Sequence, residues 1–299
     1  MAAAGIAWIA ADWSRERLSA WAMGADGTPR GEARTGAGTA ALGGQGFEGA
    51  LLDVVGDWLG ERTLVLACGD VGGPQGWADA PCPEVPCPPP SGDRAVRAPA
   101  ADPRLDVRLL PGLGQTRPAE VMRGEETRIA GLLRQEPGFD GVLCLPGAQT
   151  RWVQVSAGEV VSFRSFLTGE LVAALAQGPT LAQAVAGTGW DAAAFESALG
   201  DAMARPALVT SDLLGLRAAQ ELHGQAPAVA RARLSGLLMG LELAGARPYW
   251  LGQRLAVIGP PEEARRYAAA LAAQGAPAET HHGDSLVIEG LAAARAGLS

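Results

Sequence analysis

The sequence predicts a two-lobed α/β protein in which a β-β-β-α unit occurs twice, and three observations support this fold class. First, its 299 residues exceed the usual size of a single domain, so two lobes are the default expectation. Second, apolar residues make up 48% of the chain, which is enough to fill two cores. Third, an apolar segment followed by a tight turn opens a strand-rich region near residue 6 and again near residue 141, which indicates an internal repeat.

The first repeat begins with a continuously apolar segment that we expect to form a central strand buried on both faces. Turn residues and changes of hydrophobic periodicity divide the following chain into further elements. We expect strands at residues 6–11, 18–23, 32–35, 63–68 and 107–110, and helices at 47–59 and 120–134. Residues 81–103 are rich in proline, which predicts a surface loop or flap.

The second repeat has the same order of elements. Its strands are expected at residues 141–145, 151–155 and 160–166, and its helix at 168–176, with Thr168 as the N-cap. A mostly helical block at 179–250 follows, and the chain closes with a strand at 255–258 and helices at 262–273 and 285–298.

This pattern divides the chain into an N-terminal lobe, residues 1–118, and a C-terminal lobe, residues 119–299. The proline-rich flap lies in the first lobe and the helical block in the second. Duplicated β-β-β-α lobes with a cleft between them are typical of the actin-like ATPase fold, which is ribonuclease H-like. The fold alone does not give the function.

Charge and composition exclude several classes of protein. The net charge is −8 and the arginines are scattered among acidic residues, so no basic stripe can neutralise the phosphates of a nucleic acid. No lysine occurs, which excludes any mechanism that needs a P-loop lysine. No stretch approaches 18 uncharged apolar residues, so we expect no membrane span. The cytoplasm is the simplest compartment, and a homodimer is left open.

The hairpin turn after the first strand is a candidate phosphate loop. Asp12 stands at the end of that strand, where a carboxylate could hold a hydrated magnesium ion. Backbone N–H groups of the turn around Ser14 and Arg15 could then meet the phosphates. An ordinary hairpin whose aspartate caps the turn would have the same sequence, and both interpretations stay open.

The charged run Arg123-Gly124-Glu125-Glu126-Thr127 is a more specific candidate site. A bidentate arginine suits a substrate carboxylate, and a glutamate suits hydroxyl groups or proton abstraction. The alternative is a solvated helix N-terminus, where the macrodipole favours acidic residues. The position of the run at the junction of the lobes favours the functional interpretation.

Two further segments combine small residues with a glutamate. Thr168-Gly169-Glu170 follows the third strand of the second repeat. The helical segment from Ser235 to Glu242 has small residues at 235, 236 and 240, which would let a ligand or another helix approach closely. Tight helix packing explains this last segment at least as well as ligand contact.

Together these segments resemble the 2-dehydro-3-deoxygalactonokinase family, which has the actin-like fold. The resemblance runs nearly end to end, and the blocks Arg-Gly-Glu-Glu-Thr and Leu-Thr-Gly-Glu, in that order, are its most specific parts. It also includes Asp12-Trp13, residues 69–77, Leu145-Pro-Gly147 with Trp152, the segment 235–242 and Gly283-Asp284. It implies phosphorylation of a six-carbon sugar acid, 2-dehydro-3-deoxy-D-galactonate or a similar keto-deoxy acid, at the terminal hydroxyl, with ATP and Mg²⁺.

The resemblance also implies roles for individual residues. Arg123 would grip the substrate carboxylate, and Asp12 would position the magnesium ion through water. Glu126 or Glu170 would accept the hydroxyl proton. The substrate-binding set would be Arg123, Gly124, Glu125, Thr168 and Gly169, and the nucleotide-binding set would be Ser14, Arg15, Gly147, Gln149 and Gly259.

Three turns on the nucleotide side depart from the family pattern. Ser14-Arg15-Glu16 replaces a glycine followed by two hydroxyl residues, and Ala148-Gln149 replaces Thr-His. Gly259 is followed by two prolines and two glutamates, which removes two N–H donors and adds negative charge.

These departures support alternatives to a sugar-acid kinase. Loss of one preorganised donor commonly costs about 10²–10³-fold in rate, so three altered turns could abolish transfer. The second hypothesis is therefore a non-catalytic paralogue that binds a sugar acid but has degenerate nucleotide loops. A third, with no positive sign in the sequence, is an enzyme that uses another phosphoryl donor.

Overall fold

The computed structural model describes residues 5–298, so residues 1–4 and 299 at the outer ends of the two predicted lobes lie outside the described residues. The chain forms two compact units. Unit 1 comprises the chain up to residue 140, residues 155–162 and the chain from residue 282, and unit 2 comprises residues 141–154 and 163–281. The sequence-based division at residue 118 had instead assigned residues 119–140 and the C-terminal helix to the second lobe.

A six-stranded sheet with the order β3-β2-β1-β4-β6-β5 forms the centre of unit 1. Strands β1 and β4 are parallel neighbours, and β1 is buried along its whole length. The apolar run predicted for a central strand is confirmed, because such a strand has no face in contact with water. The strands are β1 (Trp8–Trp13), β2 (Leu18–Met23), β3 (Pro29–Thr35), β4 (Thr63–Cys68), β5 (Val96–Arg97) and β6 (Leu105–Leu109).

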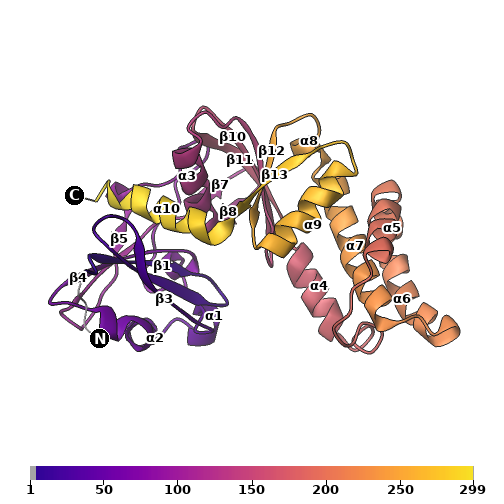
Figure 1. Cartoon of the computed structure of the whole chain (residues 1–299), viewed down its shortest axis with the longest axis horizontal. Helices are drawn as coiled ribbons and strands as arrows, with labels where there is room; N and C mark the ends of the chain where they lie inside the picture. The colour runs from indigo at the N-terminus through magenta and orange to yellow at the C-terminus, as the bar shows by residue number, and fades with distance from the viewer. Residues whose placement is uncertain (1–4, 299) are drawn as a thin grey trace. The chain divides into compact units, whose positions relative to one another are not determined.

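The α-helices of unit 1 are α1 (Thr39–Leu42), α2 (Phe47–Val55), α3 (Glu125–Gln135) and α10 (Gly283–Arg295). Short 3-10 helices lie at Gly56–Trp58, Asp70–Gly72 and Gly92–Arg94. The helices α3 and α10 lie side by side although about 150 residues separate them in sequence (Figure 1). Buried side chains of α10, such as Val287 and Leu291, pack with Trp8 and Leu66 of the sheet, which is why the C-terminal helix belongs to this unit.

A second sheet, mainly in unit 2, has the order β11-β10-β9-β12-β13. Its strands are β9 (Gly141–Leu145), β10 (Thr150–Ser156), β11 (Glu159–Phe166), β12 (Leu255–Gly259) and β13 (Ala278–His282). When the short edge strand β5 is left out of the count, this order matches β3-β2-β1-β4-β6 of the first sheet. The predicted internal repeat is therefore confirmed, and it extends to five strands in each copy.

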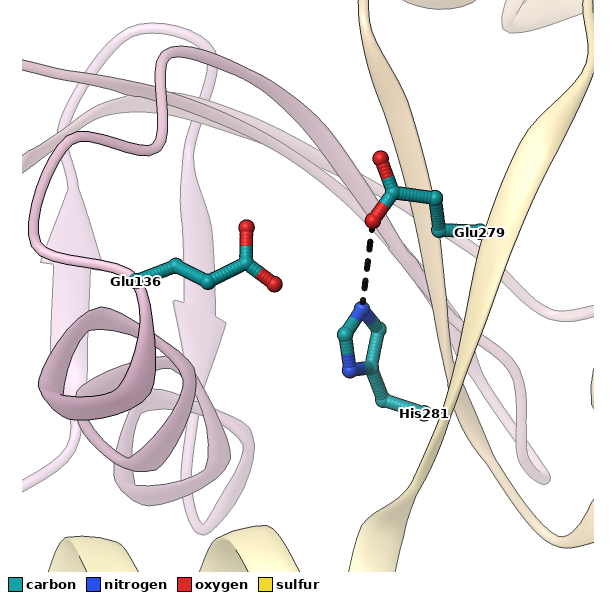
Figure 2. A group of neighbouring side chains, drawn as sticks. All are labelled: Glu136, Glu279 and His281. Carbon is teal, nitrogen blue, oxygen red and sulfur yellow. Dashed lines mark ion pairs between the residues drawn. The ribbon is translucent and has the colours of Figure 1, made fainter.

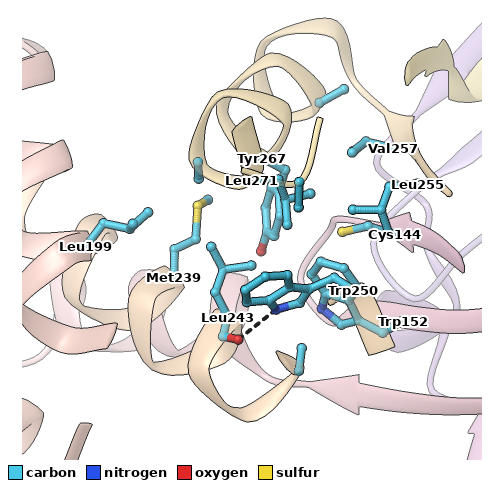
Figure 3. Packing of buried hydrophobic residues seen from close by; sticks show 14 of the residues in the cluster. Cys144, Trp152, Leu199, Met239, Leu243, Trp250, Leu255, Val257, Tyr267 and Leu271 are labelled. Carbon is cyan, nitrogen blue, oxygen red and sulfur yellow. Dashed lines mark hydrogen bonds between the residues drawn. The ribbon is translucent and has the colours of Figure 1, made fainter. Parts of the chain in front are cut away.

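The helices of unit 2 are α4 (Thr168–Gln177), α5 (Ala192–Ala204), α6 (Val209–His223), α7 (Pro227–Gly245), α8 (Arg247–Trp250) and α9 (Pro261–Ala272), with a 3-10 turn at Pro206–Leu208. The core joins the sheet to α7 and α9 through Trp152, Leu243 and Tyr267, and Trp250 Nε1 donates to the carbonyl of Leu243 at 2.8 Å (Figure 3).

Helix α7 contains the small-residue segment 235–242, and its glycines contact α5. A Cβ at Gly236 would lie 2.4 Å from the carbonyl oxygen of Phe195, and one at Gly240 would lie 2.5 Å from that of Leu199. Only glycine allows the two backbones to approach this closely. Of the two interpretations of this segment, helix packing is the one these contacts support.

Three predicted elements differ from the structure. The helix expected from residue 120 begins at Glu125, because residues 120–122 form strand β8 (Glu120–Met122), which pairs with β7 (Leu113–Gln115). Part of the proline-rich stretch is regular, since β5 pairs with β6 at the sheet edge. Leu167, not Thr168, is the N-cap of α4, because the Thr168 hydroxyl bonds to a residue of α7 instead. Among residues 5–298, no helix is both long and apolar enough to cross a membrane.

Candidate functional site

In both sheets, two parallel central strands end at the same edge, and the candidate residues gather there. In unit 1, β1 and β4 are paired so that Asp12 lies opposite Cys68. In unit 2, β9 and β12 are parallel neighbours, with Cys144 opposite Val257. Ligands of α/β sheets bind at the carboxyl ends of strands, so each unit has one candidate edge.

Asp12, at the unit 1 edge, forms an ion pair that the sequence did not reveal. Its Oδ2 atom accepts from Arg128 Nη2 at 2.6 Å, and both side chains are largely buried. Arg128 Nη1 also donates to the carbonyl of Gly124 at 3.1 Å. Burial alone would lower the pKa of Arg128, but the negative groups around it, Asp12 foremost, together raise the pKa. Arg128 thus ties β1 to the start of α3.

The run Gly124–Glu126 forms the N-terminus of α3. Gly124 is the N-cap with φ +106°, and a Cβ there would lie 3.7 Å from Asp12 Oδ1. The Gly124 N–H donates to both carboxylate oxygens of Glu126, at 2.9 and 2.7 Å, and Glu126 is 1% exposed. Burial, with a contribution from the charge of Glu125, raises the pKa of Glu126 to about 8. Glu126 therefore carries a proton over most of the neutral range and caps the helix.

Arg123 and Asp70 complete the unit 1 edge. Arg123 Nη1 donates to the carbonyls of Gly72 and Ala80, at 2.9 and 3.3 Å, which fixes its guanidinium beside the turn after β4. Asp70, in that turn, is half-buried. Burial and then the charge of Glu125 raise the pKa of Asp70, while a backbone hydrogen bond from Arg15 opposes the shift. Asp70 therefore adjoins the candidate phosphate turn.

In the turn between β1 and β2, the hydroxyl of Ser14 is engaged with the main chain. Ser14 Oγ accepts from the N–H groups of Glu16 and Arg17, at 3.3 and 3.2 Å. The side chains of Arg15 and Glu16 are exposed. Two N–H groups of this candidate phosphate turn, those of Glu16 and Arg17, are thus already hydrogen-bonded to the serine side chain.

At the unit 2 edge, the turn between β9 and β10 is held by the start of α4. The Glu170 N–H donates to the carbonyl of Ala148 at 2.8 Å, and a Cβ at Gly169 would lie 2.2 Å from the carbonyl oxygen of Gly147. Gln149 Oε1 accepts from Arg151 Nη2 at 2.7 Å. The segment 168–170 therefore packs against the turn at Gly147 and Gln149 in unit 2. The other expected substrate-binding residues, Arg123, Gly124 and Glu125, belong to unit 1.

The turn after β12 lies against the same turn. A Cβ at Gly259 would lie 3.0 Å from Cγ of Pro146. Pro260 is the N-cap of α9 and Pro261 its first residue, so two N–H donors are missing at this helix start. Glu262 forms an exposed ion pair with Arg266 in the next turn of the helix.

The last strand of the second sheet also carries charged side chains. Glu279 Oε2 lies 4.0 Å from His281 Nε2 on β13, a pair that is ionic when the histidine is protonated (Figure 2). Glu136, drawn in the same figure, belongs to unit 1. Neither residue of this pair is within the two candidate edges described above.

The carboxylates of the unit 1 edge fit a magnesium ion. Mg²⁺ binds through one or two carboxylates, waters and substrate phosphates. Asp12 Oδ2 is paired with Arg128, while Asp12 Oδ1 faces the Cys68 thiol at 3.9 Å. Burial, and after it the charge of Glu125, raises the pKa of both Asp70 and Glu126, so several acidic groups lie close together at this edge.

The model of the 2-keto-3-deoxy-galactonokinase family matches residues 12–294. The chain belongs to this family.

Relatives of the galactonokinase family agree over nearly the full length. The 2-dehydro-3-deoxygalactonokinase of Escherichia coli (strain K12) is 29% identical over 288 residues, which is 95% of this chain and 96% of that protein. A crystal structure from Sinorhizobium meliloti, of a protein assigned to the same activity, is 35% identical with a TM-score of 0.86, covering 96% of this chain and 97% of that one. Family membership makes the protein a carbohydrate kinase by class.

More distant structures show the fold of this galactonokinase-family chain. The activator of the 2-hydroxyisocaproyl-CoA dehydratase from Clostridium difficile has a TM-score of 0.52 at 8% identity, covering 97% of this chain and 94% of that one. The predicted actin-like ATPase fold is thereby confirmed.

Sequence reasoning missed two residues of the unit 1 edge, and it singled out the segment ending at Glu242 without giving that glutamate a role. Asp70 could have been found as the acid directly after an apolar strand, the same position that drew attention to Asp12. Arg128 follows Gly124 by four residues and so lies on the same side of a helix. Glu242 is an acidic residue inside an apolar helical stretch, where burial implies a bonding partner.

Proposed function

We propose that this protein transfers the γ-phosphoryl group of ATP to the terminal hydroxyl of 2-dehydro-3-deoxy-D-galactonate or a similar keto-deoxy acid. The observation that carries the proposal is the family match over residues 12–294, which spans both candidate edges. The Arg123–Thr127 block beside Asp12 supports a polyhydroxy acid as the acceptor, because it combines a fixed guanidinium with several carboxylates.

Residues of unit 1 would bind the sugar acid. Arg123, anchored by two carbonyls, would offer a preorganised guanidinium to the substrate carboxylate. Asp12 would hold Mg²⁺ through water, and the ion would neutralise charge on the phosphates. Gly124 and Glu125 would line the substrate site at the start of α3.

In this proposal Asp70 is the proton acceptor of unit 1. Glu126, one of the two carboxylates expected for this role, is buried, and its pKa of about 8 keeps it protonated at neutral pH. Asp70 is half-buried with a raised pKa, which suits a general base. Glu170 of unit 2, the other expected candidate, is exposed and stays an alternative. In the transfer, the hydroxyl oxygen bonds to the γ-phosphorus, the bond to the β-γ bridging oxygen breaks, ADP leaves, and Asp70 takes the hydroxyl proton.

Residues of the turns would bind the nucleotide. The turn at Gly147 and Gln149 and the turn at Gly259 would contact phosphates and adenosine in unit 2. Ser14 and Arg15 would contribute from the β1–β2 turn of unit 1, where Arg15 offers an exposed positive charge.

An ATP-coupled assay with 2-dehydro-3-deoxygalactonate and MgATP tests this proposal. We expect turnover with the wild type and a loss of about 10²–10⁴-fold in kcat for Asp70→Asn, since general base catalysis contributes about that much. Absence of turnover with this and related keto-deoxy acids, in a protein shown to be folded by circular dichroism, would refute the kinase proposal.

The second candidate function is a non-catalytic protein that binds a sugar acid. The observations that favour it are the engagement of the Glu16 and Arg17 N–H groups by Ser14 and the two prolines at the start of α9. Calorimetry separates the two functions: binding of the sugar acid without binding of MgATP supports the second, and clear MgATP binding counts against it.

A further inference from the structure

Glu242, on α7, is a buried carboxylate to which three neutral side chains donate. Trp152 Nε1 of β10 donates to Oε1 at 2.9 Å. The hydroxyls of Thr168 and Tyr267 both donate to Oε2, the second at 3.0 Å. Glu242 is 1% exposed, and all four residues lie within unit 2. Trp152 and Tyr267 point into the same core in Figure 3.

Removing such a carboxylate from water costs free energy. Burial raises the pKa of Glu242, and its hydrogen bonds only partly oppose the shift. A buried polar network is often no more stable than well-packed apolar side chains, so stability is a poor explanation for it. What a fully bonded carboxylate supplies is a fixed position for each donor.

Of the three donors, Thr168 is the one that connects Glu242, through the start of α4, to the turn between β9 and β10. Thr168 is the first residue of α4, and the next two residues touch that turn. Gly169 lies against the Gly147 carbonyl, and the Glu170 N–H donates to Ala148 O at 2.8 Å. Tyr267, by contrast, connects the same carboxylate oxygen to α9, and it also bonds to the Thr150 hydroxyl at 2.9 Å.

We propose that Glu242 is a positioning residue for phosphate binding, which acts through Thr168 to hold the start of α4 against the turn 146–149. This inference rests on the proposed function, because the turn binds nucleotide phosphates only if the protein is a kinase. Glu242 itself, enclosed in the core, need not touch a ligand for this role.

The matched variants Thr168→Val and Tyr267→Phe test the proposal, since each removes one hydroxyl donor from the same Glu242 oxygen while keeping the side-chain shape. Only the first breaks the link to α4. We expect Thr168→Val to raise the KM for MgATP about tenfold, as loss of a hydrogen bond to a charged group would. Tyr267→Phe should leave the KM for MgATP within about twofold of the wild type. It should lower Tm by about as much as Thr168→Val does, because each variant removes one donor from Glu242.

Two further measurements keep the test decisive. Thr168→Ser retains the hydroxyl and should restore the KM for MgATP. Hydrogen exchange at residues 147–149, which precede the Thr150 contact of Tyr267, should accelerate in Thr168→Val and not in Tyr267→Phe, and this readout needs no enzymatic activity. Equal effects of the two variants on turn exchange, or on KM, would overturn the proposal and leave Glu242 a purely structural residue.

The result that would refute the proposed function differs from the result that would refute the role of Glu242. A wild type without turnover or MgATP binding would refute the kinase function, while the exchange experiment would still decide whether Glu242 orders the turn through Thr168.

Discussion

The two sheets have the same strand order, yet the edges at the ends of their central strands differ in chemistry. At the unit 1 edge, charged side chains face one another, with Asp12 paired to Arg128 and Arg123 fixed by main-chain carbonyls. At the unit 2 edge, main-chain atoms predominate, and the one buried carboxylate of the surrounding network, Glu242, is bonded to neutral groups.

If the proposed function holds, this difference divides the work of phosphoryl transfer between the two copies. A substrate carboxylate and a magnesium ion would need fixed charges, and the first copy has such charges at its edge. Phosphates and adenosine can be bound by turns whose N–H groups point outward, which requires that the turns be held rigidly. A buried ion pair therefore supports the unit 1 edge, and hydrogen bonds from neutral donors to a buried carboxylate support the unit 2 edge.

The largest effect that would distinguish the edges is expected for Asp12→Asn. Removal of the charge leaves Arg128 buried without its ionic partner, which should cost about 3–5 kcal/mol of unfolding free energy. We also expect kcat to fall about 10²–10³-fold or more. Urea unfolding and the coupled assay measure the two effects.

The double variant Asp12→Asn with Arg128→Met serves as its control. Replacing both partners should recover part of the lost stability and none of the activity. A kcat of the single variant within tenfold of the wild type would show that the charge at Asp12 is dispensable.

The support of unit 2 can be tested at the contact between α5 and α7. Gly240→Ala places a Cβ 2.5 Å from the Leu199 carbonyl, and such overpacking should cost about 1–3 kcal/mol. Gly200→Ala, at a helix position with open space around it, should instead stabilise the protein by up to about 1 kcal/mol. Thermal unfolding of the pair checks both signs, and a neutral Gly240→Ala would contradict the close packing of α7.

The buried carboxyl group of unit 1 predicts a pH dependence of stability. Glu126 keeps its proton up to about pH 8 in the folded protein, compared with an ordinary value of 4.5. Between these values the folded state binds more protons, so this group makes the unfolding free energy fall as pH rises, by about 1.4 kcal/mol per pH unit.

Glu126→Gln is neutral at every pH and should lack this contribution. Urea unfolding at pH 5, 6, 7 and 8 should therefore show the variant gaining stability relative to the wild type as pH rises. Parallel curves for the two proteins would mean that Glu126 is ionised in the folded state.

The smallest effect is expected at the β1–β2 turn. Ser14→Gly frees the N–H groups of Glu16 and Arg17 from the serine hydroxyl and should lower the KM for MgATP by about fivefold, or about 1 kcal/mol. Ser14→Ala separates the loss of the hydroxyl from the gain in backbone freedom. An unchanged KM in both variants would show that the hydroxyl does not compete with phosphate.

The sequence by itself was sufficient for the fold class, the repeat and most elements. Hydrophobic runs such as 63–68 and 141–145 coincide with β4 and β9, because a strand buried on both faces must be apolar throughout. The block at 123–127 was recognised because residues adjacent in the chain carry its pattern. The extra strands β7, β8 and β13 were missed because they are short or polar.

Only the tertiary structure decided which partners the charged residues have. Arg128 lies 116 positions from Asp12 in the chain, and Glu242 lies 74 from Thr168, so neither pair leaves a local pattern. The same holds for Glu126, whose pKa depends on burial that its exposed-looking position at a helix start does not reveal. Local sequence fixes what the backbone does, whereas the charge and the bonding of a side chain depend on which distant segments fold against it.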